Sequence, residues 1–182
     1  MYGMIHRAAR AYAIDRFGDG FWSGFADRLG LSETDFVTAQ SYPDMATFSL
    51  IEALAEVEGL PVDDLLLRFG RYWITFASQD AYSHLMSVAG ASLQTFLRNL
   101  DRMHASIAMA LPGARMPTFR LQDQTADELL LLYSSERAGL EPFVEGLMQG
   151  LCEKFGQSAT ISWTPTADGA LFRISLARER AA

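Results

Sequence analysis

The residues most able to do chemistry in this sequence are one histidine and a group of three polar side chains that follows it. His104 lies in the apolar stripe of a predicted helix, residues 92–111, whose other members are Leu93, Leu97, Leu100, Ile107 and Leu111. A neutral imidazole is the commonest side-chain ligand of metal ions, although a histidine in such a stripe is often a core residue bonded to a neighbour. His104 is therefore a candidate metal ligand.

The polar group consists of Tyr133, Ser135 and Arg137, which are spaced two apart at the end of a predicted strand. An extended backbone would present all three side chains on one face. A guanidinium binds a carboxylate through a bidentate, charge-assisted contact, and the two hydroxyls add neutral hydrogen bonds. The group suits a ligand that carries carboxylates, and the alternative is a solvated strand end.

Considered together, the histidine and the polar group fit a haem. A haem needs an axial ligand near its centre and donors for its propionates at its edge. The composition agrees, because 12% aromatic residues, eight methionines and three tryptophans provide a large apolar inventory. Such an inventory suits either a well-filled core or a pocket for a flat cofactor.

Charge and cysteine content exclude several other classes of protein. With 15 basic and 22 acidic residues the net charge is −7, and no cluster of lysine or arginine offers a surface for nucleic acid. The chain has no apolar stretch long enough to cross a membrane and no signal-peptide core at its start, so we expect a cytoplasmic protein. Cys152 is the only cysteine, which excludes an internal disulfide.

The hydrophobic period changes from helical to alternating along the chain. In the first half, helices are predicted at residues 5–17, 21–29, 44–59 and 61–76. After Pro117, strands are predicted at 119–124, 128–134, 159–164 and 171–177, with a helix at 140–155. The fold class is α+β, and residues 1–182 are expected to form one domain with a helical subdomain at about 1–60 and an α/β subdomain at about 61–182.

Four stretches of the sequence resemble one known family. They are Met1–Ile5, Leu97–His104, Pro112–Phe119 and Tyr133–Leu140. In this order, and with Pro117 13 residues and Tyr133 29 residues after His104, they resemble H-NOX domains, the family that includes the haem domain of soluble guanylate cyclase. The resemblance runs from Met1 to about Ala177.

The resemblance implies the H-NOX fold, in which a helical N-terminal half packs on a mixed half with a four-stranded antiparallel sheet and haem b lies buried between them. It implies that His104 is the proximal ligand of the haem iron. Tyr133, Ser135 and Arg137 then bind the propionates, and Pro117 presses on the haem and bends it.

By the same resemblance, the residues on the distal side of the haem are Ile5, Ala9, Trp73 and Phe143, with Leu147 close by. Family members that bind O2 carry a tyrosine at the position of Phe143. Bound O2 gathers negative charge and needs a donor, whereas bound NO is less polar. Among these distal residues only Trp73 has a hydrogen-bond donor, its indole N–H. Buried tryptophans commonly donate this group to a backbone carbonyl. We therefore expect NO and CO to bind, and O2 to bind poorly.

These inferences describe a gas sensor and not an enzyme. Because no residues for an output domain follow the last predicted strand, we expect signalling to a separate protein. In the family such a protein is a histidine kinase or an enzyme of cyclic-di-GMP, either a diguanylate cyclase or a phosphodiesterase. The alternatives are a haem enzyme such as a peroxidase, an NO scavenger, and a haem-free binder of an apolar molecule with His104 as a core residue.

Overall fold

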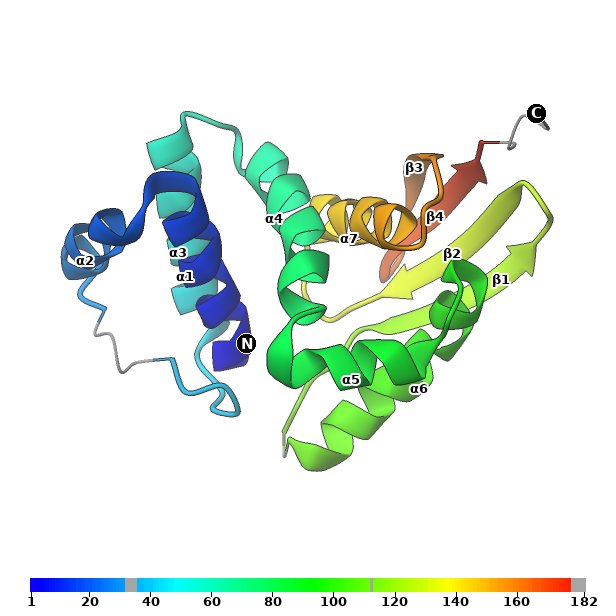
Figure 1. Ribbon diagram of the computed structural model, residues 1–182, viewed down its shortest axis with the longest axis horizontal. Coiled ribbons are helices and arrows are strands. Elements are labelled where there is room, and N and C mark those ends of the chain that lie inside the picture. Colours follow the sequence, from blue (N-terminus) through cyan, green and yellow to red (C-terminus); the bar gives the residue numbers. More distant parts are fainter. Residues whose placement is uncertain (32–35, 112, 178–182) are drawn as a thin grey trace. The chain divides into compact units, whose positions relative to one another are not determined.

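The computed structural model describes residues 1–31, 36–111 and 113–177, without the side chains of residues 80–82. The chain divides into two units, Met1–Phe69 and Gly70–Ala182. The first unit is helical, and the second combines helices with a four-stranded antiparallel sheet (Figure 1). The predicted α+β class is confirmed.

The first unit is built around helix α1 (Gly3–Phe17), which packs on α2 (Asp19–Arg28) and on α3 (Asp44–Glu58). The first half of α4 (Val62–Ala77) completes this unit. Gly59 ends α3 with a φ of 65°, a left-handed conformation that a glycine adopts without strain.

Glu58 joins three helices of the first unit through a side chain that is only 2% exposed. The Tyr12 hydroxyl of α1 donates a hydrogen bond to Glu58 at 2.6 Å, and the Arg68 guanidinium of α4 donates another at 3.2 Å. Burial, together with this carboxylate, raises the pKa of Tyr12. A buried carboxylate is costly without such partners, so the network favours one arrangement of α1, α3 and the start of α4.

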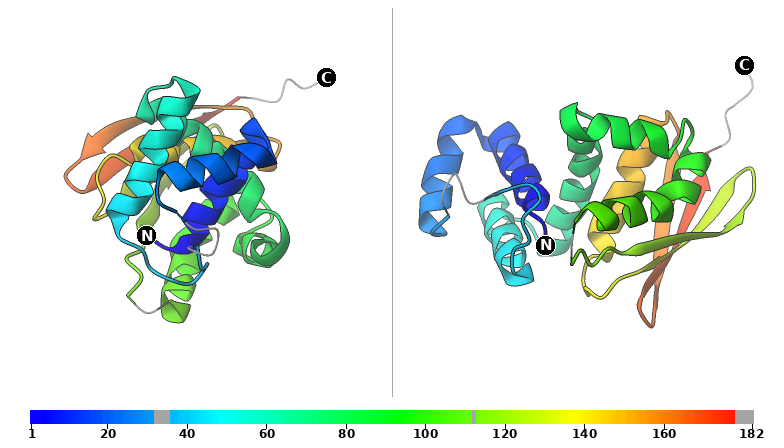
Figure 2. Two further views of the ribbon diagram at one scale, coloured as in Figure 1. Left: turned by 90° about the vertical axis from the view of Figure 1, so that its left-hand side faces the viewer. Right: turned by 90° about the horizontal axis from the view of Figure 1, so that it is seen from below.

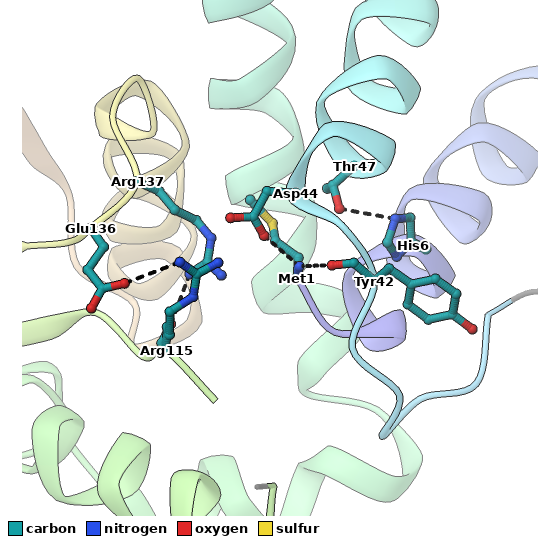
Figure 3. Close-up of polar contacts among 8 residues, drawn as sticks. All are labelled: Met1, His6, Tyr42, Asp44, Thr47, Arg115, Glu136 and Arg137. Carbon is teal, nitrogen blue, oxygen red and sulfur yellow. Dashed lines mark hydrogen bonds and ion pairs between the residues drawn. The ribbon is translucent and has the colours of Figure 1, made fainter. Parts of the chain in front are cut away.

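His6 is a core residue of the same unit. Its Nε2 lies 3.0 Å from the Thr47 hydroxyl, and its ring stacks on Phe36 with centroids 4.7 Å apart. Burial lowers the pKa of His6 to about 4, so the ring is neutral at physiological pH. Nearby, the ammonium of Met1 donates to the Asp44 carboxylate at 2.7 Å (Figure 3).

The sheet of the second unit has the strand order β1-β2-β4-β3, and every neighbouring pair is antiparallel. The strands confirm the four predicted ones and are β1 (Thr118–Gln124), β2 (Glu128–Ser134), β3 (Ala159–Thr166) and β4 (Gly169–Leu176). Alternate residues of β2 and β4 are buried, which gives the sheet an inner face of Leu129, Leu131, Tyr133, Ala170, Phe172 and Ile174.

Two helices cover the inner face of this sheet. Helix α6 (Leu93–Ala110) lies on β1, and α7 (Glu141–Lys154) lies on β3 and β4 (Figure 2). Ser92 caps α6 by accepting a hydrogen bond from the Thr95 amide, as its place before the helix favours. A shorter helix, α5 (Asp80–Ala89), was not predicted. No helix in the described ranges is long and apolar enough to cross a membrane.

Candidate functional site

His104 lies on α6 with its ring centroid 5.4 Å from that of Phe119 on β1. Its Nδ1 atom is buried and has no hydrogen-bond partner in the part of the chain that is described. Burial lowers the pKa of His104, and the Asp101 carboxylate and the backbone of Pro117 partly oppose this effect. A buried ring nitrogen without a partner is uncommon, but His6, a core residue of the first unit, shares this feature, so it does not by itself distinguish a ligand from a core histidine.

Asp101 is a residue of this site that the sequence analysis missed. It lies one turn before His104 on α6, and its carboxylate accepts the backbone N–H of Phe119 at 2.5 Å. This bond fixes the start of β1 to the helix that carries the histidine. The spacing of three residues between an aspartate and the candidate ligand was the available signal, since such residues share a helix face.

The backbone leaves the strand between Tyr133 and Arg137, so the three residues do not share one extended segment. Strand β2 ends at Ser134, and the Ser135 hydroxyl accepts a hydrogen bond from the Arg137 amide at 3.0 Å. Serine commonly bonds to a backbone amide two residues later and so favours a turn. The predicted strand at 128–134 is thus confirmed, and Ser135 and Arg137 lie in the turn that follows it.

The three side chains are nevertheless neighbours. Tyr133 is 2% exposed, and burial raises its pKa. A hydrogen bond from Ser135 and the charge of Arg137 oppose this shift, so both side chains act on the phenol. One hydroxyl and one guanidinium thus accompany a buried phenol, which is a set of donors for an anionic group.

Arg137 also reaches the segment that follows α6. Its Nη1 donates to the backbone carbonyl of Arg115 at 2.9 Å, and the Arg115 side chain lies 3.4 Å from the Glu136 carboxylate (Figure 3). The ion pair is exposed and contributes little by itself. The bond to the carbonyl holds the Arg137 guanidinium beside the segment that leads to Pro117.

Phe119 connects the candidate ligand to the donor group. Its ring lies 5.4 Å from His104 and 5.3 Å from Tyr133, centroid to centroid. The structure thus brings His104, Pro117 and the Tyr133 group together within the second unit.

The residues predicted for the distal side are divided between the two units. Trp73, half-buried on α4 and 5.8 Å from Phe76, belongs to the second unit. Phe143 and Leu147, one turn apart on α7, belong to the same unit. Ile5 and Ala9 lie on α1 of the first unit.

The fold and the site define a small α+β domain with a neutral histidine beside donors for an anionic ligand. Comparison with known proteins gives the family, because the chain matches the Haem-NO-binding family over residues 2–163. The chain belongs to this family, the H-NOX domains, which bind haem and sense gases.

Sequence relatives and solved structures agree with this assignment. Soluble guanylate cyclase 89Da of Drosophila melanogaster is 26% identical over 155 residues, which are 85% of this chain and 23% of that protein. The chain therefore spans less than a quarter of the length of this relative.

Among solved structures, an H-NOX protein from S. oneidensis in the Fe(II)NO ligation state matches with a TM-score of 0.86, 20% identity, and coverage of 98% of this chain and 100% of that chain. An oxygen-binding H-NOX domain matches with a TM-score of 0.83, 19% identity, and coverage of 98% of this chain and 96% of that chain. Because one of these similar structures is an NO complex and the other is an oxygen-binding domain, the fold alone does not determine which gas binds.

Proposed function

We propose that this domain is a sensor of NO that binds haem b with His104 as the axial ligand. One observation carries the proposal: the imidazole of His104, whose pKa burial lowers, contacts Phe119, which in turn contacts Tyr133 of the donor group. An axial ligand and propionate donors are the two requirements of a haem site. Bound haem would supply a ferrous iron that coordinates the gas.

The chain's own residues fit the rest of the haem. The Arg137 guanidinium donates to the Arg115 carbonyl, and it would bind a propionate through a charge-assisted contact. Ser135 and Tyr133 supply hydroxyls for the same edge. Pro117, directly before β1, stands beside His104 as the proposed proximal contact.

Arg137→Ala is expected to release haem faster than Ser135→Ala does. The guanidinium makes a charge-assisted contact that is roughly twice as strong as a neutral hydrogen bond. Transfer of haem to an excess of apo-myoglobin measures the rate of loss, and Arg173→Ala, an exposed arginine of β4, serves as the control. Equal rates for all three variants and the parent would remove Arg137 and Ser135 from the site.

Gas selectivity is proposed to favour NO and CO over O2. Phe143 has no hydrogen-bond donor, and a polar O2 complex needs one on the distal side. The remaining distal contacts proposed are Ile5, Ala9, Trp73 and Leu147, among which only the Trp73 indole could donate.

Exposure of the reduced protein to air is expected to give an unchanged ferrous spectrum or slow oxidation, and no stable oxy complex. Phe143→Tyr is expected to add an oxy complex, because it places a phenol where O2 would need a donor. Absorption spectra under air and under NO make the comparison. A stable oxy spectrum in the parent that disappears in Trp73→Phe would show that Trp73 is a distal donor and would overturn the proposed selectivity.

We propose a separate protein as the output, either a histidine kinase or an enzyme that makes or degrades cyclic-di-GMP. A ligand transmits a signal only if it binds two conformations with different affinity. The partner's activity is therefore expected to differ between the ferrous protein and its NO complex, and the His104→Gly variant is expected to lose this difference. If neither form binds or alters any such enzyme, the function reduces to scavenging of NO.

A further inference from the structure

Five aromatic rings form a continuous line across the second unit. The centroids of His104 and Phe119 are 5.4 Å apart, those of Phe119 and Tyr133 are 5.3 Å apart, those of Tyr133 and Phe172 are 6.3 Å apart, and those of Phe172 and Trp163 are 6.2 Å apart. Each strand contributes one ring, in the order β1-β2-β4-β3 of the sheet. The line therefore runs from the candidate haem ligand across the whole inner face to the edge strand.

The far end of this line carries a proton acceptor. Trp163 is half-buried, and its indole N–H donates to the Glu145 carboxylate on α7 at 3.1 Å. When an indole loses an electron its N–H becomes far more acidic, so a carboxylate already bonded to it can take the proton. Trp163 can thus lose an electron and a proton together.

Tyr133, the other easily oxidised ring of the line, is less suited to hold an oxidising equivalent. A phenol must release its proton when it is oxidised, and burial raises the pKa of Tyr133. In the haem-loaded protein the Tyr133 hydroxyl is proposed to bind a propionate, and that carboxylate can take the phenol proton and return it. Tyr133 is therefore a relay, and Phe119 and Phe172 bridge the steps on either side of it.

We propose that the haem-loaded domain passes one oxidising equivalent along this line of rings, so that Trp163 gives up an electron when hydrogen peroxide oxidises the haem. The proposal rests on the proposed haem site at His104 and Tyr133. Cleavage of the O–O bond takes two electrons; one peroxide oxygen would leave as water with both peroxide protons, and the other would remain with the oxidised haem. The haem supplies one electron and Trp163 the other, while the indole proton moves to Glu145.

Such a path would give a gas-binding domain a second property, the transfer of an oxidising equivalent away from its haem. Electron tunnelling slows steeply with distance, so two steps that stop at Tyr133, bridged by Phe119 and Phe172, would be much faster than one long step. The oxidising equivalent would leave the buried ring of His104 and arrive at a half-buried side chain on an edge strand. The axial ligand would then be spared.

The test adds hydrogen peroxide to the ferric, haem-loaded protein and locates the radical. Rapid-freeze electron paramagnetic resonance is expected to show a tryptophan radical, and peptide mapping is expected to find oxidation at Trp163. Trp22, which packs on Phe25 and Phe36 of the first unit, is expected to remain intact. The haem-free protein with the same peroxide is expected to show neither signal, which separates the path from direct attack on an accessible indole.

Two variants identify the path, and a third is the control. Trp163→Phe keeps a ring in place but is expected to lose the tryptophan radical and to bleach its haem faster. Glu145→Gln keeps an acceptor for the indole N–H but cannot take its proton, and is expected to lower the radical yield. Trp22→Phe is expected to behave as the parent does.

The outcomes separate this proposal from the one on which it rests. A protein that takes up no haem, and therefore shows no Soret band, overturns both. A normal Soret band with Trp163 oxidised no more than Trp22, or with an unchanged radical in Trp163→Phe, overturns the redox path alone.

Discussion

Replacing His104 with glycine is expected to produce a protein that does not retain haem unless imidazole is added. The variant removes the proposed axial ligand and opens a space beside Phe119 that free imidazole can enter. Loss of an outer contact to a metal ligand already weakens binding by roughly 10–100-fold, so loss of the ligand itself should weaken haem binding by more than about 100-fold. Titration with haem, with and without imidazole, measures the effect by absorption.

The other two histidines provide matched controls for this experiment. His84 is exposed on α5, and His6 is held by Thr47 in the first unit. His84→Gly should bind haem as the parent does, without imidazole. A His104→Gly protein that keeps the parent's ferrous spectrum without imidazole would show that another group ligates the iron. That result would overturn the proposed site.

Gly70→Ala is expected to cause a large loss of stability in the second unit. A Cβ at Gly70 would lie 2.1 Å from the Phe143 carbonyl oxygen and 3.0 Å from the Leu147 amide nitrogen. The clash is with the backbone, so no side chain can rotate away, and α4 and α7 must separate. Overpacking of this kind costs roughly 1–3 kcal/mol, occasionally more. Urea unfolding of the variant and the parent measures the difference.

The same substitution at Gly24 is the matched control. Gly24 lies exposed on α2 with nothing within 4 Å of a Cβ placed there. Alanine should stabilise that helix by roughly 0.5–1 kcal/mol, because glycine is the less favourable residue in a helix interior. Gly70→Ala should also change the spectrum of the NO complex, since Phe143 and Leu147 must move. A Gly70→Ala protein as stable as Gly24→Ala would show that α4 and α7 do not approach as closely as described.

Much of this protein could be predicted from short stretches of sequence, because local patterns decide local structure. The change of period near Pro117 predicted the strands, and Ser92 before an apolar stripe predicted the start of the helix that carries His104. The residue types alone also indicated an axial ligand and an anion-binding group. Each of these signals depends on neighbours a few residues away, which the sequence displays directly.

Contacts between distant residues were decided only in the tertiary structure. The Ser135 amide donates to the backbone carbonyl of Asp168, a partner 33 residues away, so spacing alone could not show how the chain turns after the strand. The bond from Phe119 to Asp101 and the line of rings that ends at Trp163 need a particular strand order and register. Alternating patterns show which residues of a strand face inward but not which strand lies beside it. For that reason the sequence indicated the ligand and its chemistry, while packing selected the neighbours that hold it.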